Sequence, residues 1–241
     1  MVPEGSPPWA RPPAPIPGRL WAILSGHDPL VSDAESQAIR AAVAAAEQAS
    51  AGEIVPVLVD AADDYELADW KGTTLGALTL AAAAAALHAL RPVWGPAATW
   101  LVLPAGAGAL AGFLVARFSA AARRWLAGQE RLDECVEARA FEAFLRQGVH
   151  RTRDRSGVLI LVALFERRVR ILADEGIHAA IPAETWEALA RDTARAMRDG
   201  RPGPAMLAAV ERCGELLAAR GPRRRTDDTN ELPDAPLTER I

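Results

Sequence analysis

The sequence has few cysteines, few aromatic residues and no excess of basic side chains. Cys135 and Cys213 are too few for a disulfide framework or a cysteine-based zinc site. The 27 Lys and Arg residues are outnumbered by 31 Asp and Glu residues. A general nucleic-acid binder carries a basic excess, so we expect no nucleic-acid partner. The sequence motifs of P-loop, dinucleotide-binding, serine-hydrolase and zinc-protease sites are also missing.

Charge is almost missing from the middle of the chain. Residues 72–116 contain one charged side chain, Arg91, which separates uncharged runs of 19 and 25 residues. A helix rises about 1.5 Å per residue, so 19 residues reach roughly 28 Å, close to the ~30 Å hydrocarbon core of a bilayer. The runs predict a transmembrane helical hairpin over 70–117, with helices at about 72–90 and 97–116.

The same segment has features that suit a hairpin in lipid. Glycines recur at four-residue spacing in both helices, which lets two helix backbones approach closely. Tryptophans lie near the ends of the runs, where amphipathic rings favour the headgroup level. Pro104 should bend the second helix. The glycines are Gly72, Gly76, Gly108 and Gly112, and the tryptophans are Trp70, Trp94, Trp100 and Trp125.

The alternative is a soluble, alanine-rich hairpin buried in a larger core, although such a hairpin would normally show a polar face. Positive side chains predict the orientation in a membrane: the turn has only Arg91, whereas the other ends carry Lys71 and several arginines. The chain is therefore predicted to cross the inner (cytoplasmic) membrane twice, with both termini in the cytoplasm. The arginines could also contact anionic lipid, and they are Arg117, Arg123, Arg124 and Arg131.

Segments with helix and strand patterns flank the hairpin. Ser32 and Glu35 form a capping box for a helix over 33–50. A strand at 53–59 follows, in which Pro56 indicates an edge position or a bulge. After the hairpin, we expect helices at 126–147, 183–198 and 205–219, and strands at 157–165 and 169–173.

The strand before the hairpin has no local partner, so it most simply pairs with the strand at 157–165. The hairpin is then an insertion within one α/β domain. The predicted organisation is a disordered proline-rich arm over 1–29, the two parts of the domain over 30–69 and 118–221, the hairpin between them, and a disordered polar tail over 222–241.

Seven short segments carry a resemblance to a known family. They are GEIVPV (52–57), DDY (63–65), HRT (150–152), GVLILV (157–162), ER (166–167), ILAD (171–174) and NELPD (230–234). Together they resemble the TPM-domain membrane proteins of bacteria, relatives of thylakoid photosystem II repair proteins and of a nematode receptor modulator. The resemblance implies an α/β/α sandwich and a role in complex assembly or receptor modulation. It also implies weak acid phosphatase activity or calcium binding in some members.

Three carboxylates are the candidate metal ligands. Asp63 and Asp64 could join Asp174 around Ca²⁺ or Mg²⁺ if their strands are neighbours and both loops leave the same sheet edge. The alternative is a solvated loop next to the membrane. His150 lies beside several arginines and could serve a phosphatase, or it could simply lie at a solvated helix end. We assign no catalytic residue and no other cofactor from the sequence.

These patterns favour a membrane-anchored TPM-like module without enzymatic activity. It would bind a membrane or cytoplasmic protein partner, or help to assemble a membrane complex, with the lipid bilayer as its second partner. The alternative is a weak phosphatase of the TPM type that depends on a divalent metal.

Overall fold

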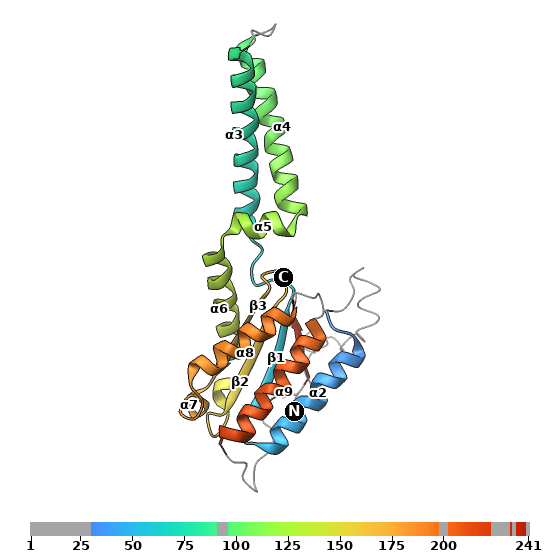
Figure 1. The fold of residues 1–241 in the computed structure, drawn as a ribbon, viewed down its shortest axis with the longest axis vertical. Coiled ribbons are helices and arrows are strands. Elements are labelled where there is room, and N and C mark those ends of the chain that lie inside the picture. The colour runs from blue at the N-terminus through green and yellow to red at the C-terminus, as the bar shows by residue number, and fades with distance from the viewer. Residues whose placement is uncertain (1–29, 91–95, 198–201, 223–231, 233–234, 240–241) are drawn as a thin grey trace, which may run out of the picture.

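The computed structural model describes residues 30–90, 96–197, 202–222, 232 and 235–239. It shows an α/β body from which a long helical hairpin extends (Figure 1). The predicted proline-rich arm, the turn of the hairpin with Trp94, and most of the C-terminal tail lie outside the described residues.

A four-stranded mixed sheet in the order β3-β2-β1-β4 forms the centre of the body. β1 (Glu53–Val59) and β2 (Gly157–Ala163) run parallel and pair along all seven residues. β3 (Arg168–Ala173) returns antiparallel to β2. The predicted pairing of the two strands that the hairpin separates is confirmed.

The fourth strand comes from the C-terminal tail. β4 (Leu237–Glu239) pairs parallel with the last three residues of β1, and the Glu239 carboxylate contacts Arg139 at 2.8 Å and Arg146. The prediction of a disordered tail is therefore wrong for this segment, because its ordering depends on partners far away in the sequence. β1 lies between β2 and β4, so the edge position predicted from the missing amide of Pro56 is wrong for this strand, although Pro56 itself lies just before the stretch that β4 covers.

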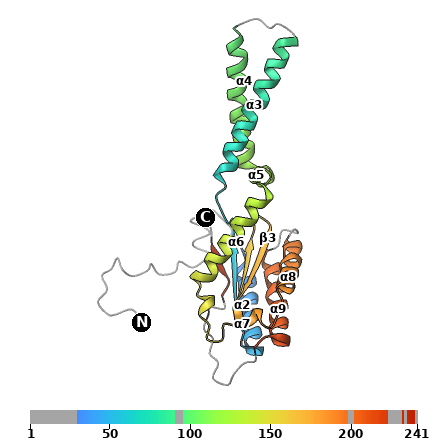
Figure 2. The same ribbon diagram turned by 90° about the vertical axis from the view of Figure 1, so that its left-hand side faces the viewer.

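Helices cover both faces of the sheet (Figure 2). On one face, Ile54 and Leu58 pack with residues of the helices α2 (Asp33–Ala49), α8 (Ala183–Ala196) and α9 (Pro202–Arg220). On the other face, Val55 and Val57 pack against α6 (Gln129–Arg146). Because both faces are buried, β1 and β2 are continuous apolar runs rather than alternating ones. The predicted α/β/α sandwich is confirmed.

The helix ends follow known capping rules. The capping box of α2 is present, since the Ser32 hydroxyl accepts a hydrogen bond from the Glu35 amide and the Ser32 amide donates to the Glu35 carboxylate at 2.8 Å. α9 begins at Pro202, three residues earlier than predicted, because proline is tolerated in the first turn, where amides lack intrahelical partners. Two short elements complete the body, the 3-10 turn η2 (Val149–Arg151) and α7 (Glu175–His178).

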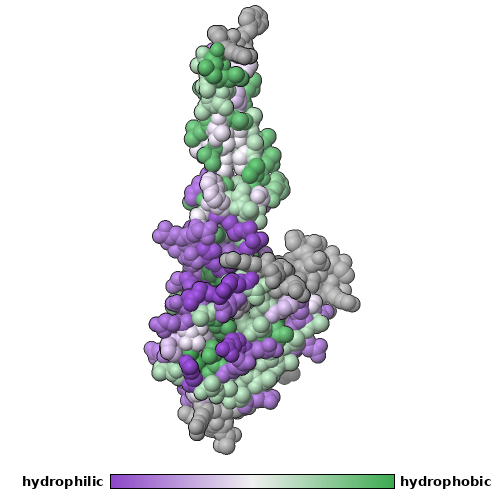
Figure 3. Space-filling model, in the orientation of Figure 1, coloured by the Kyte–Doolittle hydropathy of each residue, from purple (hydrophilic) through white to green (hydrophobic). Residues whose placement is uncertain are grey.

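The hairpin consists of α3 (Glu66–Leu90) and α4 (Ala97–Phe118), each long and apolar enough to cross a membrane. Large apolar side chains point outward along its described length, and Figure 3 shows this largely apolar shaft above a body whose surface mixes polar and apolar patches. Leu78 and Leu103 are 63% and 67% exposed. The alternative of a hairpin buried in a larger core of this chain is thus contradicted within the described residues.

The two hairpin helices contact each other through glycines. A Cβ atom added to Gly76 would lie 2.1 Å from the carbonyl oxygen of Gly108, and one added to Gly112 would lie 2.1 Å from that of Gly72. The predicted close approach of the two glycine pairs is confirmed.

After α4 the chain turns into α5 (Ala120–Ala127), a two-turn helix that crosses the foot of the hairpin (Figure 1). Gly128 then adopts φ +88°, and α6 begins at the next residue. The sequence predicted one helix over 126–147. The chain bends at Gly128 instead, in a backbone conformation that glycine adopts without strain.

Candidate functional site

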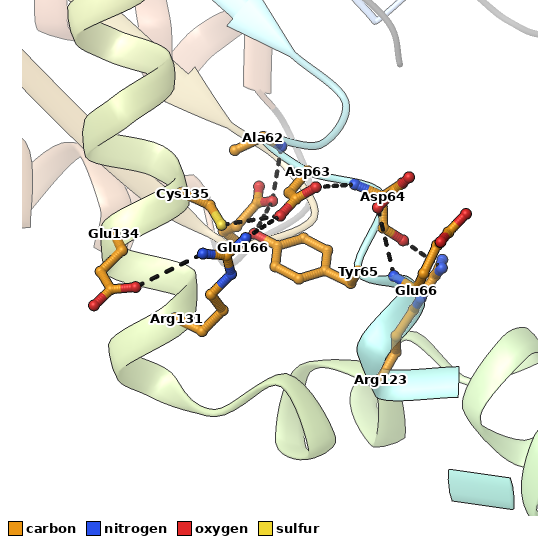
Figure 4. A network of polar contacts seen from close by, with 10 residues as sticks. All are labelled: Ala62, Asp63, Asp64, Tyr65, Glu66, Arg123, Arg131, Glu134, Cys135 and Glu166. Carbon is orange, nitrogen blue, oxygen red and sulfur yellow. Dashed lines mark hydrogen bonds and ion pairs between the residues drawn. The ribbon is translucent and has the colours of Figure 1, made fainter. Parts of the chain in front are cut away.

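The loop between β1 and α3 forms the centre of the candidate site. It lies where the hairpin joins the body, close to the β2–β3 turn and to helices α5 and α6 (Figure 4). A cavity of about 430 Å³ opens beside it. Carboxylates and arginines line this cavity together with Tyr65 and Phe165; the charged residues are Asp63, Asp64, Glu66, Asp69, Arg117 and Arg123.

A buried carboxyl group fixes this loop. Glu166, in the β2–β3 turn, is 2% exposed, and its Oε1 accepts hydrogen bonds from the Ala62 amide at 2.8 Å and from the Tyr65 hydroxyl at 2.7 Å. The Tyr65 ring packs against Phe165, with 5.2 Å between the ring centroids. The backbone of Tyr65 has φ +52°, a strained conformation for a non-glycine residue, so these contacts must hold it in place. We call this arrangement the Glu166 clasp.

Burial dominates the electrostatics of the clasp. It raises the pKa of Glu166, although the hydrogen bonds from Ala62 and Tyr65 act in the opposite direction. The pKa of Tyr65 is raised by burial and by its hydrogen bond to Glu166. The second carboxyl oxygen of Glu166 is buried and has no hydrogen-bond partner among the described residues. The site therefore favours the neutral acid more than water does.

Replacing Glu166 by alanine is expected to lower the free energy of unfolding by about 2–4 kcal/mol, because a buried hydroxyl donor and a partly buried amide donor lose their acceptor. Glu166→Gln keeps an oxygen for both donors and should cost less than about 1 kcal/mol.

The pKa of Glu166 is raised in the folded state, so its contribution to stability depends on pH. This contribution is complete below pH 4.5, the ordinary pKa of the group, and declines as the pH rises through the folded-state pKa. The stability of the parent relative to Glu166→Gln should therefore fall with rising pH.

Urea unfolding of the full chain in detergent micelles, at pH 4.5 and pH 7.5, measures both effects. An alanine variant as stable as the parent would contradict the clasp. A difference between parent and Glu166→Gln that stays constant with pH would contradict the raised pKa.

Asp63, in the loop, is paired with a cation from α6. The Asp63 Oδ2 atom accepts a hydrogen bond from Arg131 at 2.8 Å and one from the Cys135 thiol at 3.2 Å. Burial alone would raise the pKa of Asp63, but the hydrogen bonds from Cys135, the Asp64 amide and Arg131 outweigh it and lower the pKa. Burial and the Asp63 carboxylate raise the pKa of Cys135 to about 11, so its thiol is protonated at neutral pH.

Most of the arginines that follow the hairpin make contacts within the protein. Arg123 contacts the Asp69 carboxylate at 3.3 Å and donates to the Asp64 carbonyl. Arg124 donates to the Phe165 carbonyl at 3.0 Å, and its guanidinium lies 5.5 Å from the centre of the Phe165 ring. With Arg131 bound to Asp63, three of the four arginines that the sequence assigned to anionic lipid have partners in the protein.

The predicted metal site is not assembled. Asp174 caps α7 at 2.8 Å from the Glu175 amide, and its own amide donates to the carbonyl of Gly157, the first residue of β2. Asp63 and Asp64 instead follow the last residue of β1. Because β1 and β2 are parallel, the two positions lie at opposite ends of the sheet, about 20 Å apart for the six steps of 3.3 Å along a seven-residue strand.

The prediction of a joint site is wrong because β3 runs antiparallel and carries Asp174 back to the other end. Within the part of the chain that the structure describes, no group of three or more His, Cys, Asp or Glu side chains could hold a metal ion. Metal binding by Asp63 and Asp64 without Asp174 stays a prediction.

Neither His150 nor Cys213 belongs to this site. His150 lies in η2 with its ring 6.3 Å from that of Phe144, and Cys213 is fully buried in the core of the body. Glu166 and Tyr65 are the site residues that the sequence reasoning missed. Glu166 was assigned to a turn, and a single glutamate in a turn carries no local signal of burial.

Comparisons with known proteins agree with this fold. A family model described as the TPM domain matches residues 126–216, which run from the end of α5 into α9. A solved structure, the NMR structure of the BA42 protein from the psychrophilic bacterium Bizionia argentinensis, superposes with a TM-score of 0.52 and 17% sequence identity. The match covers 88% of this chain and 97% of the BA42 chain, and at this identity it shows a shared fold. No curated protein sequence matches the chain.

Proposed function

We propose that this chain, which carries a TPM domain, is a membrane-anchored module whose α/β body is held at one membrane surface by α3 and α4. The observation that carries the proposal is the outward-facing apolar surface of the hairpin. Leu101, Val102 and Val115 are between 52% and 65% exposed, with no partner in the described part of the body. Acyl chains would cover this surface, because exposed apolar area of this extent is unfavourable in water.

The foot of the hairpin supports an interfacial position for α5. Trp70, Phe118 and Trp125 are 70%, 81% and 71% exposed at this level. Tryptophan side chains such as those of Trp70 and Trp125 concentrate at the boundary between hydrocarbon and headgroups. Both α3 and α4 return to the same body, so the two junctions lie on the same side of the bilayer. The positive-inside rule favours the cytoplasm for that side, with Lys71 and Arg117 at the helix ends.

The proposed role is non-enzymatic: the body docks a membrane or cytoplasmic protein partner and helps to assemble a membrane complex. Supporting this role, the arginines of α5 and α6 tie the foot of the hairpin to the loop and to the β2–β3 turn, as the contacts of Arg123 and Arg124 show. These contacts restrict rotation of the body relative to the membrane. A restrained body presents its surfaces to a membrane partner at a defined height and orientation.

Reporter fusions to the full chain test the topology. Green fluorescent protein fused after residue 241 should fluoresce, and alkaline phosphatase inserted in the turn at residue 93 should be active, because the phosphatase folds only outside the cytoplasm. The opposite pattern would overturn the orientation. If neither reporter were active in the membrane fraction, the two-pass arrangement would be wrong.

A second candidate function is a weak divalent-metal-dependent phosphatase, for which the acidic lining of the cavity beside Asp63 is the supporting observation, although no three of its described carboxylates are grouped so as to hold a metal ion. The pairing of Asp63 with Arg131 speaks against it, since a bound cation would have to displace the guanidinium. We expect Ca²⁺ to shift the thermal midpoint of the parent and of the Asp63→Asn, Asp64→Asn double variant equally. A stabilisation by Ca²⁺ that only the parent shows, together with hydrolysis of a generic phosphate ester, would favour the phosphatase.

A further inference from the structure

Two grooves at the foot of α3 differ in charge. One lies between α3 and α4, has a volume of about 610 Å³, and contains Glu66 and Asp69. The other lies between α3 and α5 and has a volume of about 560 Å³. Lys71 is the charged residue among those that line the second groove, and its other walls include Trp70, Trp125, Leu75 and Leu78. We call it the Lys71 groove.

The ammonium group of Lys71 is held in a defined place. Its Nζ atom donates a hydrogen bond to the carbonyl of Leu126 in the last turn of α5, at 3.0 Å. Lysine has three N–H donors, so two remain for a ligand. Because no carboxylate of the described residues lines the groove, an anion at Lys71 would meet no repulsive side chain from them.

The groove also has a polarity gradient along the hairpin. Lys71 directly precedes the uncharged run of α3, whereas Leu75 and Leu78 lie one and two turns further along the helix. Leu78 is about 10 Å deeper at 1.5 Å per residue. Trp70 and Trp125 flank the mouth, and both are largely exposed. A cation at the headgroup level followed by an apolar wall matches the chemistry of an anionic phospholipid.

We propose that the Lys71 groove binds one anionic phospholipid, with its phosphate at Lys71 and an acyl chain along Leu75 and Leu78. The proposal rests on the membrane anchoring proposed above. It gives Lys71 the lipid contact that the sequence had assigned to four arginines, three of which are paired within the protein. A lipid in this place would contact both α3 and α5, and would stabilise the angle between the hairpin and the interfacial helix.

Native mass spectrometry of the full-length protein in detergent tests this site. The probes are dioleoylphosphatidylglycerol, which is anionic, and dioleoylphosphatidylcholine, which has the same acyl chains and no net charge. The first phosphatidylglycerol should bind about fivefold more tightly than the first phosphatidylcholine, the effect of one lysine near a lipid surface. Lys71→Ala should abolish this preference, and Lys71→Arg should keep it.

Arg117→Ala is the matched control, because it removes one exposed positive charge from the same end of the hairpin but outside the groove. Equal loss of preference in Lys71→Ala and Arg117→Ala would overturn the site, since general surface charge would then explain it. Equal binding of both lipids to the parent would also overturn it. A dimer that Lys71→Ala dissociates, without any lipid preference, would assign the groove to a second copy of the chain and overturn the proposal.

The membrane anchoring is judged separately, from the retention of the parent in alkaline-washed membranes. A protein that is retained but shows no preference for phosphatidylglycerol contradicts only the lipid site. A protein that is released contradicts both proposals. Unchanged circular dichroism spectra and thermal midpoints of the Lys71 variants without added lipid exclude a folding defect as the cause of any loss.

Discussion

Replacing Gly76 by isoleucine is expected to separate the two helices of the hairpin and to lower its stability by about 1–3 kcal/mol or more, the usual cost of overpacking. The reason is geometric: a Cβ atom at this position would lie 2.1 Å from the Gly108 carbonyl oxygen and 3.0 Å from the Gly112 Cα atom. Both neighbours are backbone atoms, so no side-chain rotation relieves the clash. One helix must move as a whole.

Gly106→Ala is the matched control, because a Cβ atom there meets nothing within 4 Å. It should be neutral or slightly stabilising, since alanine is favoured over glycine in a helix by up to about 1 kcal/mol. Equilibrium unfolding in mixed micelles with increasing dodecyl sulfate, followed by circular dichroism, compares the variants. If Gly76→Ile unfolded together with the parent, the close glycine contact would be wrong.

Replacing Leu80 by arginine is expected to impair insertion of the hairpin by about 3 kcal/mol, the difference between leucine and arginine at the centre of a membrane helix. Leu80 lies near the middle of the uncharged run of α3 and is 41% exposed. In water, an arginine at a partly exposed helix position would be nearly neutral. The substitution therefore distinguishes lipid from water as the surroundings of the hairpin.

The control for Leu80→Arg is Leu145→Arg on α6, where the leucine is 46% exposed and belongs to the body. The amount of full-length protein recovered from the membrane fraction should fall several-fold for Leu80→Arg and stay unchanged for Leu145→Arg. Equal recovery of the two variants would indicate that the hairpin does not lie in hydrocarbon.

Much of the fold could be predicted from local patterns. The capping box at Ser32 marks the start of α2, and the apolar runs at 53–59 and 157–163 are the two central strands. Their pairing across the hairpin followed from the rule that a strand needs a partner. These features depend on neighbouring residues or on burial of both sheet faces, which sequence periodicity reports directly.

The features that were missed depend on distant partners. β4 has only three residues and orders on β1 and on arginines of α6, about a hundred or more positions earlier in the chain. The strand direction of β3, which places Asp174 away from Asp63, follows from a short turn at Arg167 with φ +56°. Neither feature has a periodic pattern of its own.

The contacts of the candidate site could not be predicted either, because they join residues that are distant in the sequence. The acidic loop before the hairpin and the arginines after it were each recognised, but as a metal site and as a lipid contact. The structure pairs them, as the contact between Asp63 and Arg131 shows. Opposite charges 68 residues apart have no sequence signal that joins them.

The most direct test of the account is an alkaline wash of membranes that contain the full-length parent chain. A high-pH carbonate wash opens membrane vesicles and releases proteins held at the surface by charge, whereas hydrocarbon-spanning helices stay in place. The account predicts that the chain remains in the pellet with integral membrane proteins and is released only by detergent. Recovery of the chain in the supernatant would contradict a hairpin that crosses the bilayer.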